Sequence, residues 1–301
     1  MMASKFDSMT NEQVNDHNAR LRKRAHTRHI VALTMTYILM VFVTLFMVFP
    51  LFIVLMTSFT PAKLTNQWPP KIIPQQFTLD NYVSLFQRLP IGQEMLNTLL
   101  FAAAVTLLSL LFNSLAAYGL SMIDFRGRGL LLGILIATMM IPGMALLIPV
   151  YKLLSGMGLV NSYWGIIIPR IADVGGIFLL RSFFITIPKD LANAARVDGA
   201  SEWRIWWQIV LPNSKAALLT VGMFTFMGNW NDLLWPLIMT SSPETRTITA
   251  GLAMLNGHGS SVTPYGVVMA GALISALPLL IVFFFVQKSF VQGIAMTGMK
   301  G

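Results

Sequence analysis

The sequence predicts an all-α integral membrane protein with about six transmembrane helices and both termini in the cytoplasm. Three observations predict this fold class. Of the 301 residues, 55% are hydrophobic and only 11% are charged, against roughly 25% charged residues in soluble domains. Long apolar runs recur along the chain, and a run of about 20 residues is enough to cross a bilayer. Lysine and arginine are unequally distributed between the segments that separate these runs.

Six apolar segments are long enough to span a membrane. Backbone amides that face lipid need partners within their own segment, so each span is expected to be a helix. The spans cover residues 30–57, 95–123, 129–151, 163–186, 213–239 and 264–287. Prolines at or inside them are expected to kink the helices; these are Pro50, Pro142, Pro169, Pro236 and Pro278.

The segment 30–57 is expected to stay in the protein as an anchor. No charged residue occurs between Arg28 and Lys63, whereas the apolar part of a signal peptide has about 7–15 residues and ends at a cleavage site of small residues. A cluster of basic residues precedes the segment, which is typical of a cytoplasmic flank. The cluster consists of Arg20, Arg22, Lys23, Arg24 and Arg28.

The basic residues also predict the orientation of the whole chain. With the N-terminus inside, the cytoplasmic segments hold 14 lysines and arginines and the outer segments hold 5, so both termini are expected inside. This bias explains the net charge of +9 without a nucleic-acid partner. The predicted parts are a cytoplasmic tail, a six-helix domain with a long cytoplasmic loop at 187–215, and a second cytoplasmic tail: 1–29, 30–287 and 288–301.

The loop 187–215 has the most specific pattern. A first helix fits Lys189–Val197 and ends before Gly199, which can take the left-handed conformation that closes helices. A second helix can begin with Ser201 as N-cap and Glu202 in its first turn. Its expected apolar stripe is Trp203, Trp206, Trp207 and Val210.

Two interpretations of this helix-turn-helix remain open. It is either a compact knob that docks a protein or an amphipathic hairpin that rests on lipid headgroups, because tryptophans suit both surroundings. In both, Pro212 is expected to open the following span, since proline is favoured in the first helical turn.

Short pieces of the loop have a distinctive order and spacing: Ala194-Ala195, Asp198-Gly199-Ala200 and Ile209-Val210-Leu211-Pro212. Together they resemble the "EAA" loop of binding-protein-dependent ABC importer permeases, most closely the sugar-import branch. The resemblance covers nearly the whole chain. It includes Asn97, the run 228–237, Met269-Ala270-Gly271, Pro278, Gln287, Phe290, Gly293 and the closing run 298–301.

The resemblance implies a type I ABC importer permease in a bacterial cytoplasmic (inner) membrane. It implies a second permease, a dimeric ABC ATPase that uses ATP and Mg, and an extracytoplasmic solute-binding protein that delivers a sugar or a glycerol phosphate. Membrane lipid surrounds the spans, and this chain itself is expected to bind no cofactor or metal. The chain has no Gly-Lys pair and hence no Walker A phosphate loop.

The resemblance also implies which loop residues couple to the ATPase. They are Asp190, Asn193, Ala194, Ala195, Asp198, Gly199, Ala200, Trp203, Ile209, Leu211 and Pro212. One residue departs from the family pattern: Asn193 stands where the family has a glutamate that contacts a basic residue of the ATPase. We expect that charge-assisted bond to be weakened here.

Charged residues inside the spans are candidate functional groups, because they are costly in lipid. Arg170, Asp173 and Arg181 lie in the fourth span, and Arg170 and Asp173 are spaced to neutralise each other on a helix. The candidate substrate path or gate comprises Asn97, Trp230, Asn231 and Asp232. Packing between helices is the alternative role for Trp230.

The positions of the polar residues bear on three other function classes. An intramembrane enzyme is disfavoured because all four histidines lie outside the spans, which leaves no zinc ligands or serine partner at membrane depth. These histidines are His17, His26, His29 and His258. A proton-coupled secondary transporter using Asp173 or Asp232 remains the alternative function, and a scaffold protein is a third.

Overall fold

The computed structural model describes residues 11–65, 72–255 and 263–298. The predicted tails lie partly outside this description, at 1–10 and 299–301. The regular structure of the described residues is helical. In chain order the elements are α1 (Asn11–Ser58), α2 (Ala62–Thr65), α3 (Asp80–Arg88), α4 (Ile91–Met122), α5 (Arg128–Thr138), η2 (Gly143–Leu146), α6 (Leu147–Gly156), α7 (Tyr163–Ile167), η3 (Ile168–Arg170), α8 (Val174–Phe184), α9 (Lys189–Val197), α10 (Glu202–Ile205), η4 (Trp206–Val210), α11 (Leu211–Asn213), α12 (Lys215–Trp230), α13 (Leu234–Met239), α14 (Ile248–Met254) and α15 (Tyr265–Gly298).

Three helices in the described residues are long and apolar enough to cross a membrane unbroken: the part of α1 from His26, the whole of α4, and α15 as far as Phe285. They match the first, second and sixth predicted spans. α1 begins at Asn11 and α15 reaches Gly298, so both run on as helix beyond the predicted span ends into the predicted tails.

The third, fourth and fifth predicted spans are not continuous helices, which corrects the sequence-based boundaries. α5 and the η2–α6 segment meet at 85°, and the fourth span is divided into α7, η3 and α8. In the fifth, α12 ends at Trp230 and α13 starts at Leu234. Pro142 and Pro169 lie in the first two of these interruptions, where the missing proline amide leaves a turn unbonded.

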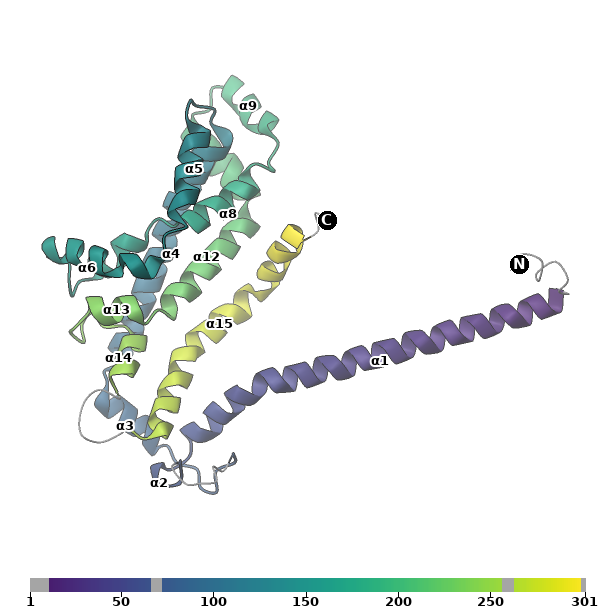
Figure 1. The fold of residues 1–301 in the computed structure, drawn as a ribbon, viewed down its shortest axis with the longest axis horizontal. Helices are drawn as coiled ribbons and strands as arrows, with labels where there is room; N and C mark the ends of the chain where they lie inside the picture. Colours follow the sequence, from purple (N-terminus) through teal and green to yellow (C-terminus); the bar gives the residue numbers. More distant parts are fainter. Residues whose placement is uncertain (1–10, 66–71, 256–262, 299–301) are drawn as a thin grey trace.

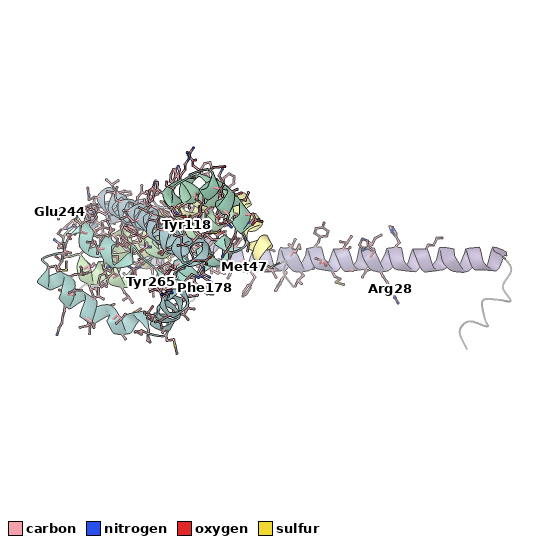
Figure 2. All side chains as sticks on the ribbon, turned by 90° about the horizontal axis from the view of Figure 1, so that it is seen from above. Arg28, Met47, Tyr118, Phe178, Glu244 and Tyr265 are labelled. Atoms are coloured by element: carbon pink, nitrogen blue, oxygen red, sulfur yellow. The ribbon has the colours of Figure 1, made fainter. Side chains whose placement is uncertain are left out.

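The helix α4 is the centre of the bundle. It packs against α8 and α12, while α15 contacts α12 and the end of α1. Figure 1 shows α9 at one end of the bundle and α2 and α3 at the other. α1 extends away from the rest, as Figure 2 shows from above, and its apolar side chains are exposed, as lipid-facing side chains are.

Among the described residues, three buried clusters hold the bundle together. One joins α4, α8 and α12 to the loop elements α9, α10 and η4. A second joins α4 to α3, α14 and α15 at the opposite end. The third, in between, joins α4 to α6, α7 and α13. The loop at 187–215 is therefore packed onto the bundle by apolar side chains.

Candidate transport pocket and cytoplasmic knob

The first half of the loop folds as the sequence predicts. α9 spans Lys189–Val197, and Gly199 has φ = +79°, a left-handed conformation that glycine adopts without a steric penalty. The Ser201 side chain accepts a hydrogen bond from the Arg204 amide and caps α10, which places Glu202 in the first turn. We call the segment 187–213 the knob.

The second half of the knob differs from the prediction. Its helix passes into a π-helical stretch, Trp206–Val210, whose wider turns change the angular spacing of side chains. Trp206 and Val210 are buried, but Trp203 and Trp207 are each 61% exposed, so the expected four-residue stripe is divided between two faces. Pro212 lies in α11, before the 83° bend that leads into α12, and does not open the span.

A polar cluster that the sequence analysis missed ties the knob to α4. Glu202 accepts hydrogen bonds from Arg196 Nε at 2.7 Å and Nη2 at 3.0 Å and from the Tyr118 hydroxyl of α4. Arg196 Nη2 also donates to the Met122 carbonyl oxygen. The hydrogen bonds from Arg196 lower the pKa of Glu202 below its usual range. The sequence signal for this cluster is a pair of opposite charges, Arg196 and Glu202, on either side of the Gly199 turn.

The predicted coupling residues are divided between surface and support. Asp190, Asn193, Ala194, Asp198, Gly199, Trp203 and Pro212 are exposed, whereas Ala195, Ala200, Ile209 and Leu211 are half-buried. A cavity of about 220 Å³ opens between the two arms of the knob and is lined partly by Ala195, Asp198 and Ile209. Asn193 is hydrogen-bonded to Arg196. Their role in coupling stays a prediction.

The charges of the fourth span do not pair as the sequence predicts. Arg170 forms an ion pair with Asp232 and donates to Asn229 Oδ1 at 3.2 Å. Asp173 instead caps α8 by accepting from the Gly176 amide at 2.7 Å. The expected Arg170–Asp173 pair is therefore wrong, because the chain is interrupted between η3 and α8 and a helical i, i+3 spacing does not apply there.

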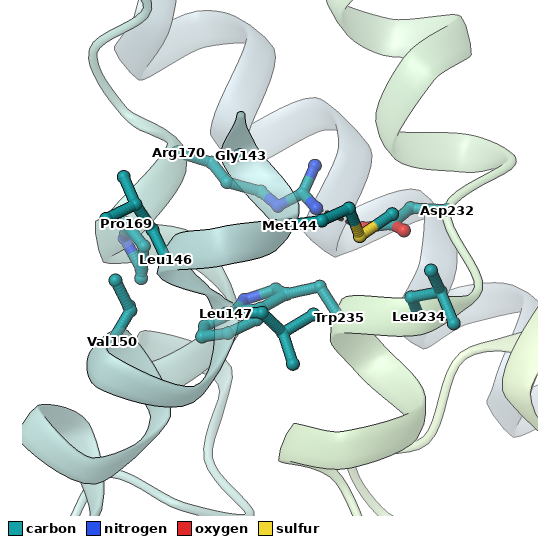
Figure 3. Close-up of a pocket in the computed structure, with 10 residues that line it drawn as sticks. All are labelled: Gly143, Met144, Leu146, Leu147, Val150, Pro169, Arg170, Asp232, Leu234 and Trp235. Atoms are coloured by element: carbon teal, nitrogen blue, oxygen red, sulfur yellow. Dashed lines mark ion pairs between the residues drawn. The ribbon is translucent and has the colours of Figure 1, made fainter. Parts of the chain in front are cut away.

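Arg170 and Asp232 line an open pocket of about 520 Å³. Figure 3 shows the two side chains approaching each other above Trp235. The lining residues come from three interruptions, namely the η2 turn, the η3 turn and the stretch between α12 and α13, and from the first turns of α6 and α13. Broken backbone at membrane depth is tolerated where it lines a cavity, and in transporters it marks the substrate path.

Of the four predicted path residues, only Asp232 lines this pocket. Asn97 is buried and hydrogen-bonded to Tyr163 and to the Arg246 carbonyl. Trp230 is buried, and its Nε1 donates to the Ser275 carbonyl oxygen. Asn231 is exposed and bonded to the α12 backbone. Both buried residues therefore pack helices together.

Arg181, the remaining intramembrane charge, donates from Nε to the Leu120 carbonyl at 3.1 Å. It thereby bonds the end of α8 to the end of α4, where a helix leaves carbonyl groups without intrahelical partners.

A buried ion pair lies at the opposite end from the knob. Arg246 Nε donates to Glu94 Oε1 at 2.7 Å, and the Glu94 side chain has no exposed surface. Gly251 makes room for this carboxylate, because a Cβ at that position would overlap Glu94 Oε2. We call Glu94, Arg246 and Gly251 the outer seam. The sequence analysis missed it, since its first two members are far apart in the chain.

Comparisons with known proteins identify the family of this chain. A family model described as "Binding-protein-dependent transport system inner membrane component" matches residues 109–296. The arabinooligosaccharides transport system permease protein AraQ of Bacillus subtilis is 33% identical over 275 residues, which cover 90% of this chain and 96% of the relative. The sn-glycerol-3-phosphate transport system permease protein UgpE of Yersinia pestis is 30% identical, covering 86% and 94%.

A solved structure has the same fold. It is a bacterial ABC transporter involved in the import of the acidic polysaccharide alginate, with a TM-score of 0.76 and 24% identity, covering 88% of this chain and 98% of that one.

Broken helices around a charged pocket define the class of this protein as a multi-pass membrane transport component. The match over more than half of the chain defines the family. The chain belongs to the binding-protein-dependent transport system inner membrane components, which are multi-pass inner-membrane permeases.

Proposed function

We propose that this chain is the permease subunit of an ATP-driven, binding-protein-dependent importer of carbohydrates and forms half of the translocation path. One observation carries the proposal: the same chain has a knob packed onto one end of α4 and a pocket with charged lining residues at the interruptions of the neighbouring helices. The related AraQ, an arabinooligosaccharide permease, supports the substrate class.

The knob is the docking element for a separate ATPase, which supplies ATP and Mg chemistry. Exposed acidic groups, Asp190 and Asp198, flank the position of Asn193 and keep negative charge near a basic partner surface. Because Asn193 is bonded to Arg196 within the knob, docking depends on shape more than on the family's ion pair.

The other partners follow from the two ends of the molecule. A second permease covers the open side of the pocket and completes the path, and an extracytoplasmic binding protein meets the end that carries the outer seam. A structure of a related alginate transporter in complex with its periplasmic protein supports a partner of this kind. The knob then faces the cytoplasm, as the basic residues predict.

The contacts of the two candidate proton carriers disfavour a secondary transporter. Asp173 accepts a backbone hydrogen bond as a helix cap, and Asp232 is paired with Arg170. Both carboxylates are therefore held in contacts within the chain, and the related sugar and glycerol phosphate permeases support the importer over a secondary transporter.

Affinity purification in mild detergent from the native membrane tests the proposal. The tagged chain is expected to bring down a second permease and an ATPase, and ATP hydrolysis is expected only while the ATPase is present. Recovery of the chain without either partner, or hydrolysis by the isolated chain, would contradict it.

A further inference from the structure

The pocket combines polar groups with apolar walls. The polar residues that line it are Arg170, Asp232 and Trp235. The other side chains that line it are apolar: Met144, Leu146, Leu147, Val150, Pro169 and Leu234. Its volume of about 520 Å³ falls in the range of ligand pockets, roughly 300–1,000 Å³.

Trp235 holds a hydrogen-bond donor without a partner. The residue is only 6% exposed, and its Nε1 is a buried donor that bonds to no acceptor among the described residues. Figure 3 shows the indole extending from α13 toward Leu147. A buried donor left unpaired is unfavourable, so an acceptor supplied by a ligand would stabilise this arrangement.

The charge of the pocket favours an uncharged ligand. Arg170 and Asp232 contribute one charge of each sign, and they are the only charged residues among those that line it. An anion that approaches Arg170 also approaches the Asp232 carboxylate, and like charges repel each other. A polar but neutral molecule can bond to both without this penalty.

We propose that the pocket is a binding site for a neutral oligosaccharide and selects against anionic substrates such as glycerol phosphates and acidic sugars. Arg170 and Trp235 donate to sugar oxygens, Asp232 accepts from sugar hydroxyls, and the apolar walls contact the C–H face of a pyranose or furanose ring. The inference rests on the proposed function and names the substrate class of that path.

The test uses the complex purified through the tagged chain and placed in lipid nanodiscs. Saturation-transfer NMR measures the binding of lactose, maltose and arabinobiose, with digalacturonate and sn-glycerol 3-phosphate as anionic probes. Wild-type complex is expected to transfer saturation to at least one neutral disaccharide, and a hundredfold excess of either anion is expected not to displace it.

Trp235→Phe isolates the N–H from the ring. The loss of one hydrogen bond is expected to weaken disaccharide binding about five- to tenfold, while the apparent melting temperature of the sugar-free complex stays the same or rises, because the unpaired donor is gone. Trp164→Phe, at a 60% exposed tryptophan outside the pocket, is the matched control and is expected to change neither value.

Three results would overturn the inference: no saturation transfer to any neutral disaccharide, unchanged binding in Trp235→Phe, or displacement by the anions. The last would identify an anion site, and the first would fit a pocket filled by lipid or by the second permease. The proposed function fails separately, if the tagged chain brings down no ATPase.

Discussion

The outer seam and the pocket each hold an arginine paired with a carboxylate, but their surroundings differ. In the seam, Glu94 has no exposed side-chain surface and Arg246 is 12% exposed. In the pocket, Asp232 is 15% exposed and Arg170 is 34% exposed. Gly251 lets the backbone close over the first pair, whereas the second lines open space. The same kind of ion pair therefore holds packed helices together in the seam, whereas in the pocket it is accessible to solvent and to a ligand.

The largest expected effect is a difference in protein stability when the carboxylate of each pair is removed. Glu94→Gln leaves the Arg246 charge buried without a counter-charge, which typically costs about 3–5 kcal/mol. Asp232→Asn leaves Arg170 beside an open cavity and is expected to cost under about 2 kcal/mol. Fluorescence-detection size-exclusion thermostability of the two variants measures the difference, and equal losses would remove the distinction between closed and open pairs.

The next effect tests the space around the seam. Gly251→Ala adds a methyl group that overlaps Glu94 Oε2, and overpacking of this kind costs about 1–3 kcal/mol. Gly228→Ala in α12 is the matched control, because a Cβ there meets nothing within 4 Å. The same thermostability assay applies; a Gly251→Ala protein as stable as the control would show that the seam is loosely packed.

In the knob, Gly199 is required for its backbone conformation and not for space. A Cβ at Gly199 has room, but the φ of +79° is strained for a β-branched residue, which costs about 1–3 kcal/mol. Gly199→Val is expected to redirect α10 and reduce ATPase retention during purification, while Gly199→Asn, which tolerates this conformation, retains it. Full ATPase retention by Gly199→Val would favour the hairpin that rests on lipid.

The smallest expected effect concerns the Arg196–Glu202 pair, whose side chains are 31% and 46% exposed. Hydrogen bonds from Arg196 lower the pKa of Glu202, so its contribution to stability is present above the ordinary glutamate pKa and is lost as pH falls through the lowered value. Hydrogen exchange of the knob, corrected for intrinsic rates, is expected to stay constant from pH 7 to about pH 5 and to rise only in more acidic solution. Glu202→Gln is expected to remove this pH dependence. If hydrogen exchange of the knob still rises in acidic solution in that variant, a group other than Glu202 causes the rise.

Local signals in the sequence were enough for the first arm of the knob. Gly199 and Ser201 act on their immediate neighbours, so the end of α9 and the start of α10 could be predicted. Hydropathy likewise located α4, because length and composition alone make a span. The π-helical stretch was not predictable, since packing of Trp206 against the bundle, and not a residue motif, accompanies it.

Pairings between distant segments could not be predicted from spacing. Arg170 selects Asp232 over Asp173 because the chain turns after η3 and the α12–α13 interruption faces it. The Glu94–Arg246 pair depends in the same way on how the segment before α14 folds against α4. Sequence reasoning therefore identified Asp232 as a functional candidate but gave it the wrong neighbours.

The most direct test of the account is sugar uptake into proteoliposomes. The complete complex with its binding protein is expected to accumulate a neutral oligosaccharide only when ATP is hydrolysed on the knob side, and a proton gradient alone is expected to drive none. Accumulation by this chain without the ATPase, driven by a proton gradient, would contradict the assignment and identify a secondary transporter.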